Sequence, residues 1–360
     1  MSNPPHRRVF LVGYYGVPNV GDEAIRAAIE HGAADAGATV TWYSTRDPAD
    51  RSERAVRLRD GRFVRYAIAC SRADRVVLGG GGILKDEGWG MPVELFITSL
   101  LARLSRTPIR MLAVGVGPFY TRLGRMLVAA VARMCEVRSV RDPDSAGELA
   151  RLGIRGVEVA ADPIFSLLPV VRSAARVPDA EPTALISVRP WFHMGESDGE
   201  SRRDRLRSAI RDAAQLLVER GYAVEFIGMH WPRDRQEAEA IVSGLPANDR
   251  IRVRDARVTW SSLVEACASA SLVIGMRYHA LAAAAMVGRP AVAVAYEPKV
   301  ESLANSLGLF RVSVDSPDIV ERLPLLVRDA LDRPHATQAP ESNLAALHAA
   351  SVGAIRRALG

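Results

Sequence analysis

Cationic side chains gather at the ends of apolar segments in the second half of the chain. Arg189 follows the first such segment in ISVRPW, and Arg277 and His279 form an Arg-x-His element in GMRYHALAAAA. The segment AYEPKV adds Glu297 and Lys299. A bidentate Arg suits phosphate or carboxylate oxygens, and the N–H groups at a helix N-terminus add to the same field. The pattern predicts that Arg189, Arg277, His279 and Lys299 converge on one rim that holds an anion.

A histidine and an aspartate follow another apolar segment, in GMHWPRD (228–234). His230 is a candidate ligand contact and a second candidate acid, although a purely structural contact between His230 and Asp234 would give the same pattern. Tyr278, inside the Arg-x-His element, is a further candidate contact. An Arg at a strand end is usually a surface charge, and a His near a helix start is often a cap. The prediction of a site therefore rests on the fact that several such residues follow successive strands.

Three glycine-rich loops follow apolar segments in the first half, at 13–25 (GYYGVPNVGDEAI), 79–88 (GGGGILKDEG) and 115–119 (GVGPF). Open α/β sheets bind ligands beyond the carboxyl ends of their strands, where such loops let backbone approach a ligand. None has the spacing of a P-loop or of the dinucleotide-binding fingerprint. Asp22 is a candidate base, with helix capping as the alternative. The candidate contacts in these loops are Gly16, Asn19, Gly81, Gly82 and Lys85.

Short apolar segments alternate with helix-length segments along almost the whole chain. Segments that are apolar throughout are typical of parallel strands covered on both faces. The segment 202–221 has one apolar stripe and a glycine at its end, as expected for an amphipathic helix. The alternation predicts doubly wound sheets. Strands are expected at 8–15, 39–44, 75–80, 109–117, 136–142, 157–162, 183–190, 223–230, 251–255, 272–277, 291–296 and 311–314.

The sequence predicts two Rossmann-like domains of similar size. The chain has 360 residues, which exceeds the usual length of one domain. Residues 169–182 are rich in Pro, Ala and charge and lack periodicity, so we interpret them as a linker. We expect an N-terminal domain over 1–175, a C-terminal domain over 183–335, and a final helix within 340–360 that packs back on the first domain.

Composition excludes several classes of protein. The 47 basic and 41 acidic residues give a net charge of +6 without a basic run that interleaves with aromatics, so nucleic-acid binding is not expected. Lys85 and Lys299, the only lysines, both lie in candidate loops. Cys70, Cys135 and Cys267 show no C-x-x-C spacing, which favours a reduced, cytoplasmic location. No apolar run is long enough to span a bilayer, so we expect at most peripheral membrane contact.

These loops, in this order, resemble the polysaccharide pyruvyltransferase family, and GMR-x-HA together with YEPKV carries the most specific part of the resemblance. The resemblance implies a fold like that of glycosyltransferase-B (GT-B) enzymes, with the active site in the cleft between the domains. It also implies transfer of pyruvate from phosphoenolpyruvate to two sugar hydroxyls as a ketal, with release of phosphate. The matching stretches are GYYGVPNVGDEAI, GGGGILKDEG, GVGPF, VRDPDS, ADPIF, ISVRPW, GMRYHALAAAAMVGRP and AYEPKV.

The resemblance assigns the contacts with phosphoenolpyruvate to Arg277, His279 and Arg189. The two arginines would hold the phosphate and the carboxylate and stabilise the departing phosphate. Because imidazole titrates near neutrality, His279 would protonate the methylene carbon. Asp22 or Glu23 would act as base toward the acceptor hydroxyl.

A nucleotide-sugar-dependent GT-B glycosyltransferase is the alternative function, although no site for a base and ribose can be identified. A non-enzymatic sugar-binding or sensor protein is a third class, which the density of titratable groups disfavours. The expected partners are phosphoenolpyruvate as co-substrate and a sugar or glycan acceptor, without a cofactor or metal. Tyr278 stands where the family commonly has Leu, and Lys85 where it commonly has Gln. The acceptor, its attachment to a lipid and the formation of a homo-oligomer stay open.

Overall fold

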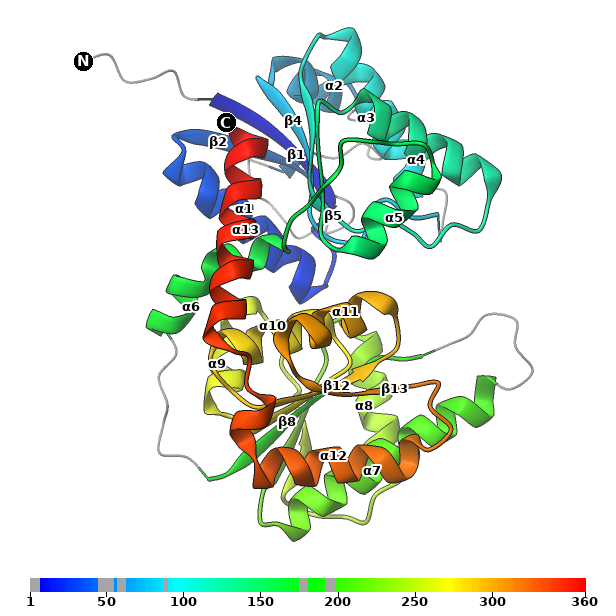
Figure 1. Ribbon diagram of the computed structural model, residues 1–360, viewed down its shortest axis with the longest axis vertical. Helices are drawn as coiled ribbons and strands as arrows, with labels where there is room; N and C mark the ends of the chain where they lie inside the picture. Colours follow the sequence, from blue (N-terminus) through cyan, green and yellow to red (C-terminus); the bar gives the residue numbers. More distant parts are fainter. Residues whose placement is uncertain (1–6, 45–54, 57–62, 87–89, 175–180, 192–198) are drawn as a thin grey trace. The chain divides into compact units, whose positions relative to one another are not determined.

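The computed structural model describes residues 7–44, 55–56, 63–86, 90–174, 181–191 and 199–360 (Figure 1). The chain divides into two compact units, each built on a parallel sheet. The first unit contains Met1–Val17, Asp22–Leu167 and Ala346–Gly360, and the second contains Pro18–Gly21 and Leu168–Ala345.

The first unit has a sheet in the order β3-β2-β1-β4-β5-β6-β7, as far as the chain is described. The order reverses between β1 and β4, which makes this pair a topological switch point. The strands are β1 (Arg7–Tyr15), β2 (Ala38–Ser44), β3 (Ala55–Val56), β4 (Arg75–Gly79), β5 (Ile109–Val114), β6 (Val137–Val140) and β7 (Glu158–Val159). The helices are α1 (Val20–Asp35), α2 (Phe63–Arg72), α3 (Gly90–Leu104), α4 (Arg122–Met134), α5 (Pro143–Arg151) and the 3₁₀ helix η1 (Pro163–Leu167).

The second unit has a sheet in the order β10-β9-β8-β11-β12-β13 within its described residues, with the switch point between β8 and β11. The strands are β8 (Thr183–Ser187), β9 (Ala223–Ile227), β10 (Ile251–Val253), β11 (Leu272–Gly275), β12 (Ala291–Ala295) and β13 (Phe310–Ser313). The helices are α6 (Leu168–Ala174), α7 (Gly199–Glu219), α8 (Arg233–Val242), α9 (Trp260–Ser269), α10 (Tyr278–Met286), α11 (Pro298–Leu307), α12 (Ile319–Asp332), η2 (Pro334–Thr337) and α13 (Glu341–Leu359).

Both sheets are covered by helices on their two faces, as Figure 1 shows for each unit. Every residue of β11 and β12 is buried, and so are four of the five residues of β8 and β9. Burial on both faces explains why these strands are apolar throughout. The expectation of doubly wound parallel sheets is therefore confirmed.

The strands end earlier than the apolar pattern indicates. The expected strand 183–190 ends at Ser187, and the expected strand 272–277 ends at Gly275, because the chain turns into loops at these points. The pattern also missed the two-residue strand β3, which is too short to show a period. Residues 168–174 form α6, where we predicted a linker. The expected helices within 202–221 and 340–360 are present as α7 and α13.

The last part of α13 belongs to the first unit. Ser351 donates to the carbonyl of Pro163 at 3.0 Å, and a ring nitrogen of His348 lies 2.9 Å from the carbonyl of Phe165. Arg7 on β1 donates to the carbonyl of Gly360 at 3.0 Å. These bonds anchor the end of the chain on η1 and on the first sheet.

The three cysteines are free and buried, and burial raises the pKa of Cys70 to about 11 and that of Cys135 and Cys267 to about 12. Such thiols are protonated and inert at neutral pH. Among the described residues, no helix combines the length and the apolar character needed to cross a membrane.

Candidate active site

The carboxyl edge of the second sheet brings together side chains from four loops. Arg189 follows β8, His230 follows β9, Arg277 follows β11 and Glu297 follows β12. These four strands are neighbours in the sheet and run parallel, so their carboxyl ends lie side by side. The edge flanks the switch point, where open α/β sheets bind ligands.

Arg277 forms a two-pronged ion pair with Asp234. Its Nε donates to one carboxylate oxygen at 2.8 Å and an Nη donates to the other. Asp234 is fully buried in the first turn of α8 and also accepts the backbone N–H groups of Met229 (3.1 Å) and His230 (2.9 Å). Burial alone lowers the pKa of Arg277, but the Asp234 carboxylate outweighs it and raises the pKa above its ordinary value. Arg277 is therefore a fixed cation at this edge.

The surroundings of His230 favour the neutral form of its imidazole. Burial lowers the pKa of its imidazole, and the positive charge of Arg277 lowers it further. Its Nδ1 is buried and has no hydrogen-bond partner among the described residues. A neutral imidazole accepts a hydrogen bond readily but is a poor proton donor at neutral pH.

Arg189 stacks on an aromatic ring at the same edge. Its guanidinium carbon lies 4.2 Å from the ring centroid of Tyr296, a cation–π contact, and its Nε donates to the carbonyl of Pro190 at 3.2 Å. Lys299 forms an ion pair with Glu297 at 2.7 Å. Burial raises the pKa of Glu297, but the charge of Lys299, hydrogen bonds from Lys299 and Tyr296, and the charge of Arg189 together lower it below its usual range. Arg189, Arg277 and Lys299 thus all interact electrostatically with Glu297, while their convergence with His279 on one anion-binding rim stays a prediction.

His279 lies in the first turn of α10 against a glycine backbone. A Cβ atom added to Gly21 would lie 2.1 Å from Nδ1 of His279, so only a glycine lets the chain approach the imidazole this closely. On the other side, the ring of Tyr278 meets the imidazole edge-on at a centroid distance of 5.2 Å. Tyr278 is buried, so it supports the imidazole more than it lines an open surface.

The loop segment 18–21 belongs to the second unit, although sequence reasoning placed the whole loop in the first domain. Val20 donates its N–H to the carbonyl of Met229 at 3.1 Å, and Trp231 donates to the carbonyl of Pro18 at 3.1 Å. Asn19 thereby forms an antiparallel bridge with His230. Backbone bonding, which leaves no signature in sequence, thus brings Asn19 to the side of His230.

The carboxyl edge of the first sheet holds the other candidates. Gly16 donates its N–H to Glu23 at 2.8 Å, which ties the loop after β1 to the first turns of α1. Gly81 adopts a φ of +68°, and a Cβ there would lie 2.8 Å from an Asp22 carboxylate oxygen. The structure therefore brings Asp22 to the 79–88 loop, while Gly82 has open space around it.

Lys85 is half-buried in the same loop, next to Asp86. Asp86 accepts the backbone N–H groups of Tyr120 (2.6 Å) and Thr121 (2.7 Å) and the Thr121 hydroxyl (2.7 Å). These bonds tie the loop after β4 to the start of α4. The aspartate therefore fixes the loop that carries Lys85.

Sequence reasoning did not single out Arg141 and Asp162 as site residues. Both are buried, with an Nη of Arg141 3.4 Å from an Asp162 oxygen. The other Nη lies 2.9 Å from where a Cβ of Gly115 would stand, so Arg141 reaches the glycine loops of this edge. The sequence did offer one signal for Arg141, since it is a charged residue that follows a strand in the segment VRDPDS. Tyr296 was missed as well, because an aromatic residue inside an apolar segment reads as core.

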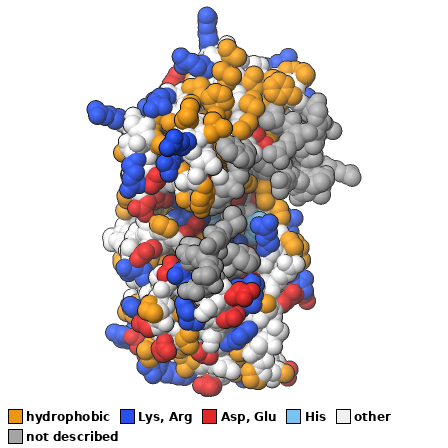
Figure 2. Space-filling model, turned by 90° about the vertical axis from the view of Figure 1, so that its right-hand side faces the viewer, with side chains coloured by type: hydrophobic (Ala, Val, Ile, Leu, Met, Phe, Trp, Pro, Cys, Tyr) orange, Lys and Arg blue, Asp and Glu red, His pale blue; other side chains and the backbone are white. Residues whose placement is uncertain are grey.

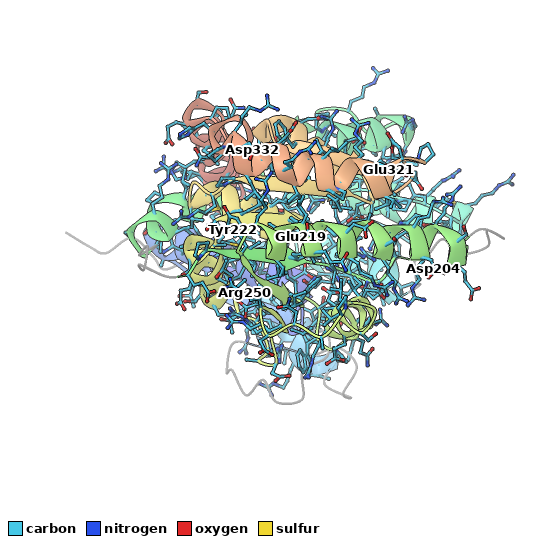
Figure 3. All side chains as sticks on the ribbon, turned by 90° about the horizontal axis from the view of Figure 1, so that it is seen from below. Asp204, Glu219, Tyr222, Arg250, Glu321 and Asp332 are labelled. Carbon is cyan, nitrogen blue, oxygen red and sulfur yellow. The ribbon has the colours of Figure 1, made fainter. Side chains whose placement is uncertain are left out.

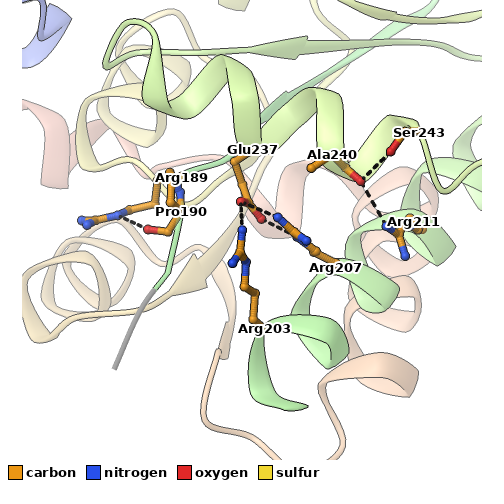
Figure 4. A network of polar contacts seen from close by, with 8 residues as sticks. All are labelled: Arg189, Pro190, Arg203, Arg207, Arg211, Glu237, Ala240 and Ser243. Atoms are coloured by element: carbon orange, nitrogen blue, oxygen red, sulfur yellow. Dashed lines mark hydrogen bonds and ion pairs between the residues drawn. The ribbon is translucent and has the colours of Figure 1, made fainter. Parts of the chain in front are cut away.

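The second unit also has an arginine–carboxylate network between α7 and α8 (Figure 4). Arg207 donates to both oxygens of Glu237 at 2.7 and 2.8 Å, and Arg203 adds a third bond at 3.2 Å. Glu237 is buried, and the network ties α7 to α8. Arg189, also labelled, extends away from this network. Arginine pairing with a buried carboxylate is therefore not by itself a mark of the site.

No cluster of three or more His, Cys, Asp or Glu side chains in the described ranges has the arrangement to hold a metal ion. The cations of the site are supplied by arginine and lysine side chains.

Solved structures share this architecture over nearly the whole chain. UDP-GlcNAc 2-epimerase from Neisseria meningitidis, bound to UDP-GlcNAc, superposes with a TM-score of 0.66 at 13% identity, covering 98% of this chain and 99% of that chain. The same epimerase from Methanocaldococcus jannaschii gives 0.63 at 12% identity, with 98% and 99% covered. MurG from Acinetobacter baumannii gives 0.53 at 15% identity, with the same coverage. The protein has the two-domain α/β fold of the GT-B class.

The family follows from the sequence match. The model of the polysaccharide pyruvyl transferase family matches residues 19–298, well over half of the chain. The chain belongs to the polysaccharide pyruvyl transferase family, which confirms the resemblance drawn from its loops. No curated protein matches the chain at a significant level.

Proposed function

We propose that this enzyme transfers pyruvate from phosphoenolpyruvate to two hydroxyls of a sugar or glycan, forming a ketal and releasing phosphate. The observation that carries the proposal is the set of cations, Arg189, Arg277 and Lys299, at one sheet edge beside His279. Phosphoenolpyruvate carries a phosphate and a carboxylate, so it requires several cations. Family membership supports a pyruvyl transfer, and the charge of the edge supports this donor.

The reaction balances without a change of oxidation state and without a cofactor. A proton from the His279 imidazolium adds to the methylene carbon of phosphoenolpyruvate and leaves an oxocarbenium-like centre at C2. One acceptor hydroxyl attacks C2 and gives up its proton to a base. The C–O bond to phosphate then breaks, the second hydroxyl attacks C2, and its proton leaves with the phosphate. Arg277 and Arg189 hold the two anionic groups and stabilise the departing phosphate.

The two histidines at the edge are suited to different roles. His230 has its pKa lowered by burial and by Arg277, so it is neutral when a proton must be delivered. We therefore assign the acid to His279 and a hydrogen-bonding role toward the donor to His230. Asp22 is proposed as the base toward the acceptor, since Glu23 is already engaged by the backbone of Gly16 and by Arg26. Gly16, Asn19, Gly81, Gly82, Lys85, Tyr278 and Glu297 remain proposed contacts or supports.

The test is a turnover assay with phosphoenolpyruvate and a panel of sugar acceptors. We expect phosphate release that depends on the acceptor, with a product whose mass has increased by one pyruvyl ketal. The same panel with UDP-sugars is the matched control. Release of UDP with a glycosylated product, and no phosphate from phosphoenolpyruvate, would replace pyruvyl transfer with glycosyl transfer.

A further inference from the structure

Exposed apolar side chains of the described residues concentrate on three helices of the first unit. Of the twelve large hydrophobic residues that are exposed in the described part of the chain, eight lie on α2, α3 or α4, and Tyr120 lies directly before the N-cap of α4. Val64, Leu104 and Met126 are the most exposed members on these three helices. Helix α3 packs against both α2 and α4, so the three helices form one continuous surface. Figure 2 shows hydrophobic side chains gathered on one face of this unit.

The charges on the same helices have one sign. Helices α2, α3 and α4, all of whose residues are described, hold a single acidic residue, Glu94, and it is buried. Their exposed arginines include Arg65, Arg103, Arg122 and Arg125, none of which forms an ion pair with a described residue. We call the exposed side chains of α2, α3 and α4 the apolar–basic face. An apolar surface rimmed by unpaired cations marks an interaction site.

We propose that the apolar–basic face docks on an anionic lipid bilayer surface. Aliphatic side chains that stand out from a surface enter the headgroup region, and arginines beside them bind anionic headgroups. A second copy of the same face is disfavoured, because a symmetric contact would bring like charges together. Nucleic acid is disfavoured too, since the exposed apolar side chains of these helices are aliphatic apart from Phe63, which leaves a single ring on which a base can stack.

Helices α7 and α12 of the second unit differ from the apolar–basic face in the distribution of their charges. Along α7 and α12, acidic and basic residues are mixed, with Glu219, Asp204, Glu321 and Asp332 among the labelled side chains of Figure 3. Several cations there are paired, for example Arg202 on α7 with Asp315 at 3.3 Å and Arg220, directly after α7, with Asp332 at 3.1 Å. A face of this kind has no net attraction for an anionic surface, so the second unit supplies matched control positions.

Membrane binding by the apolar–basic face does not depend on the reaction with phosphoenolpyruvate. Its link to the reaction, delivery of the enzyme to a lipid-anchored acceptor, rests on the proposed function. Vesicle binding needs neither donor nor acceptor, so it can succeed while pyruvyl transfer fails, and the reverse also holds.

The experiment is flotation of the full chain with vesicles of phosphatidylcholine alone or of phosphatidylcholine with phosphatidylglycerol. We expect binding to the anionic vesicles only, weakened by added salt through screening. Arg125→Gln on α4 should reduce partitioning about fivefold, the worth of one cation near an anionic surface. Leu123→Glu should reduce it roughly tenfold or more, by replacing inserted carbons with a repelled charge.

The controls use positions of equal exposure on α12. Leu123 and Leu325 are 49% and 48% exposed, so Leu325→Glu is the matched partner of Leu123→Glu. Arg328 is exposed like Arg125, so Arg328→Gln is the partner of Arg125→Gln. The α12 variants should bind like the wild type, and all four should keep the wild-type melting temperature. The proposal would be overturned if the protein bound neutral vesicles equally well, or if the α12 variants lost as much binding as the α4 variants. It would also be overturned if the protein bound no vesicles and instead bound DNA or formed a dimer that depends on Leu123.

Discussion

The carboxyl edges of the two sheets differ in what they offer a ligand. The second edge carries fixed cations, with Arg277 locked on buried Asp234 and Arg189 stacked on Tyr296. The first edge carries glycine loops, in which Gly80 and Gly81 adopt positive φ angles and pack against the start of α1. Both edges lie at a switch point of a doubly wound sheet. The same architecture is thus equipped for an anion in one unit and for close backbone approach in the other.

This difference supports a division of labour in the proposed reaction. Phosphoenolpyruvate needs concentrated positive charge, which the second edge supplies. A sugar needs hydrogen-bonding groups and room, which glycine backbone supplies. Substitutions at the second edge should therefore affect donor binding and turnover, while equivalent changes in the first unit should leave donor binding intact.

The largest expected effect comes from removing the carboxylate that holds Arg277. Asp234→Ala leaves a buried guanidinium without its counter-charge, and we expect the free energy of unfolding to fall by about 3–5 kcal/mol. Urea denaturation measures it. Asp162→Ala breaks a comparable buried pair in the first unit and should also destabilise the protein. The folded fraction of that variant should still bind phosphoenolpyruvate. If both variants lost phosphoenolpyruvate binding, the claim that only the second edge binds the donor would be wrong.

Substitution of the proposed acid comes next. His279→Ala should lower kcat by roughly 10²-fold or more, the usual worth of general acid catalysis. His279→Asn should do nearly as badly, because an amide cannot supply the proton. Single-turnover rates for both variants, with donor affinity measured separately, decide the point, and His335→Asn on η2 serves as control. Substantial rescue by Asn would make His279 a cap or a phosphate contact and move the acid role to His230.

A change of cation should cost less than a change of acid. Arg277→Lys replaces a planar fork by a point charge, which cannot satisfy Asp234 and a ligand together. We expect a loss of about 2 kcal/mol in kcat/KM. Arg207→Lys is the matched control, because Arg207 makes the same two-pronged bond to a buried carboxylate, Glu237, and does not follow a strand of the sheet. If the two variants show equal kinetics, Arg277 is a structural residue.

The smallest expected effect concerns pH. Burial and the charge of Arg277 lower the pKa of His230 in the folded state, so the folded protein binds fewer protons there than the unfolded chain. Stability from this group is full above about pH 6.5, the ordinary pKa of histidine, and is lost as the pH falls through the lower folded value. His230→Gln should therefore show a smaller decrease in melting temperature between neutral and mildly acidic pH. An unchanged pH dependence would contradict the lowered pKa.

Much of the second edge could be predicted from sequence, because residues that follow parallel strands must meet at one edge. Arg189, Arg277 and Lys299 were proposed as site residues on this ground. The pairing of Arg277 with Asp234 could not be predicted, because Asp234 lies on another helix and tertiary packing determines which cation it contacts. The approach of Gly21 to His279, and the pairing of Asn19 with His230, depend on backbone contacts between distant segments. Helix α6 was missed because its few residues show no clear period.

The most direct test of the central claim is a calorimetric titration of the wild-type protein with phosphoenolpyruvate, run beside UDP-GlcNAc. If the cations of the second edge form the donor site, phosphoenolpyruvate binds, Arg277→Lys weakens that binding, and Arg207→Lys does not. Binding of UDP-GlcNAc with no detectable binding of phosphoenolpyruvate would contradict the account and make the second edge a nucleotide-sugar site.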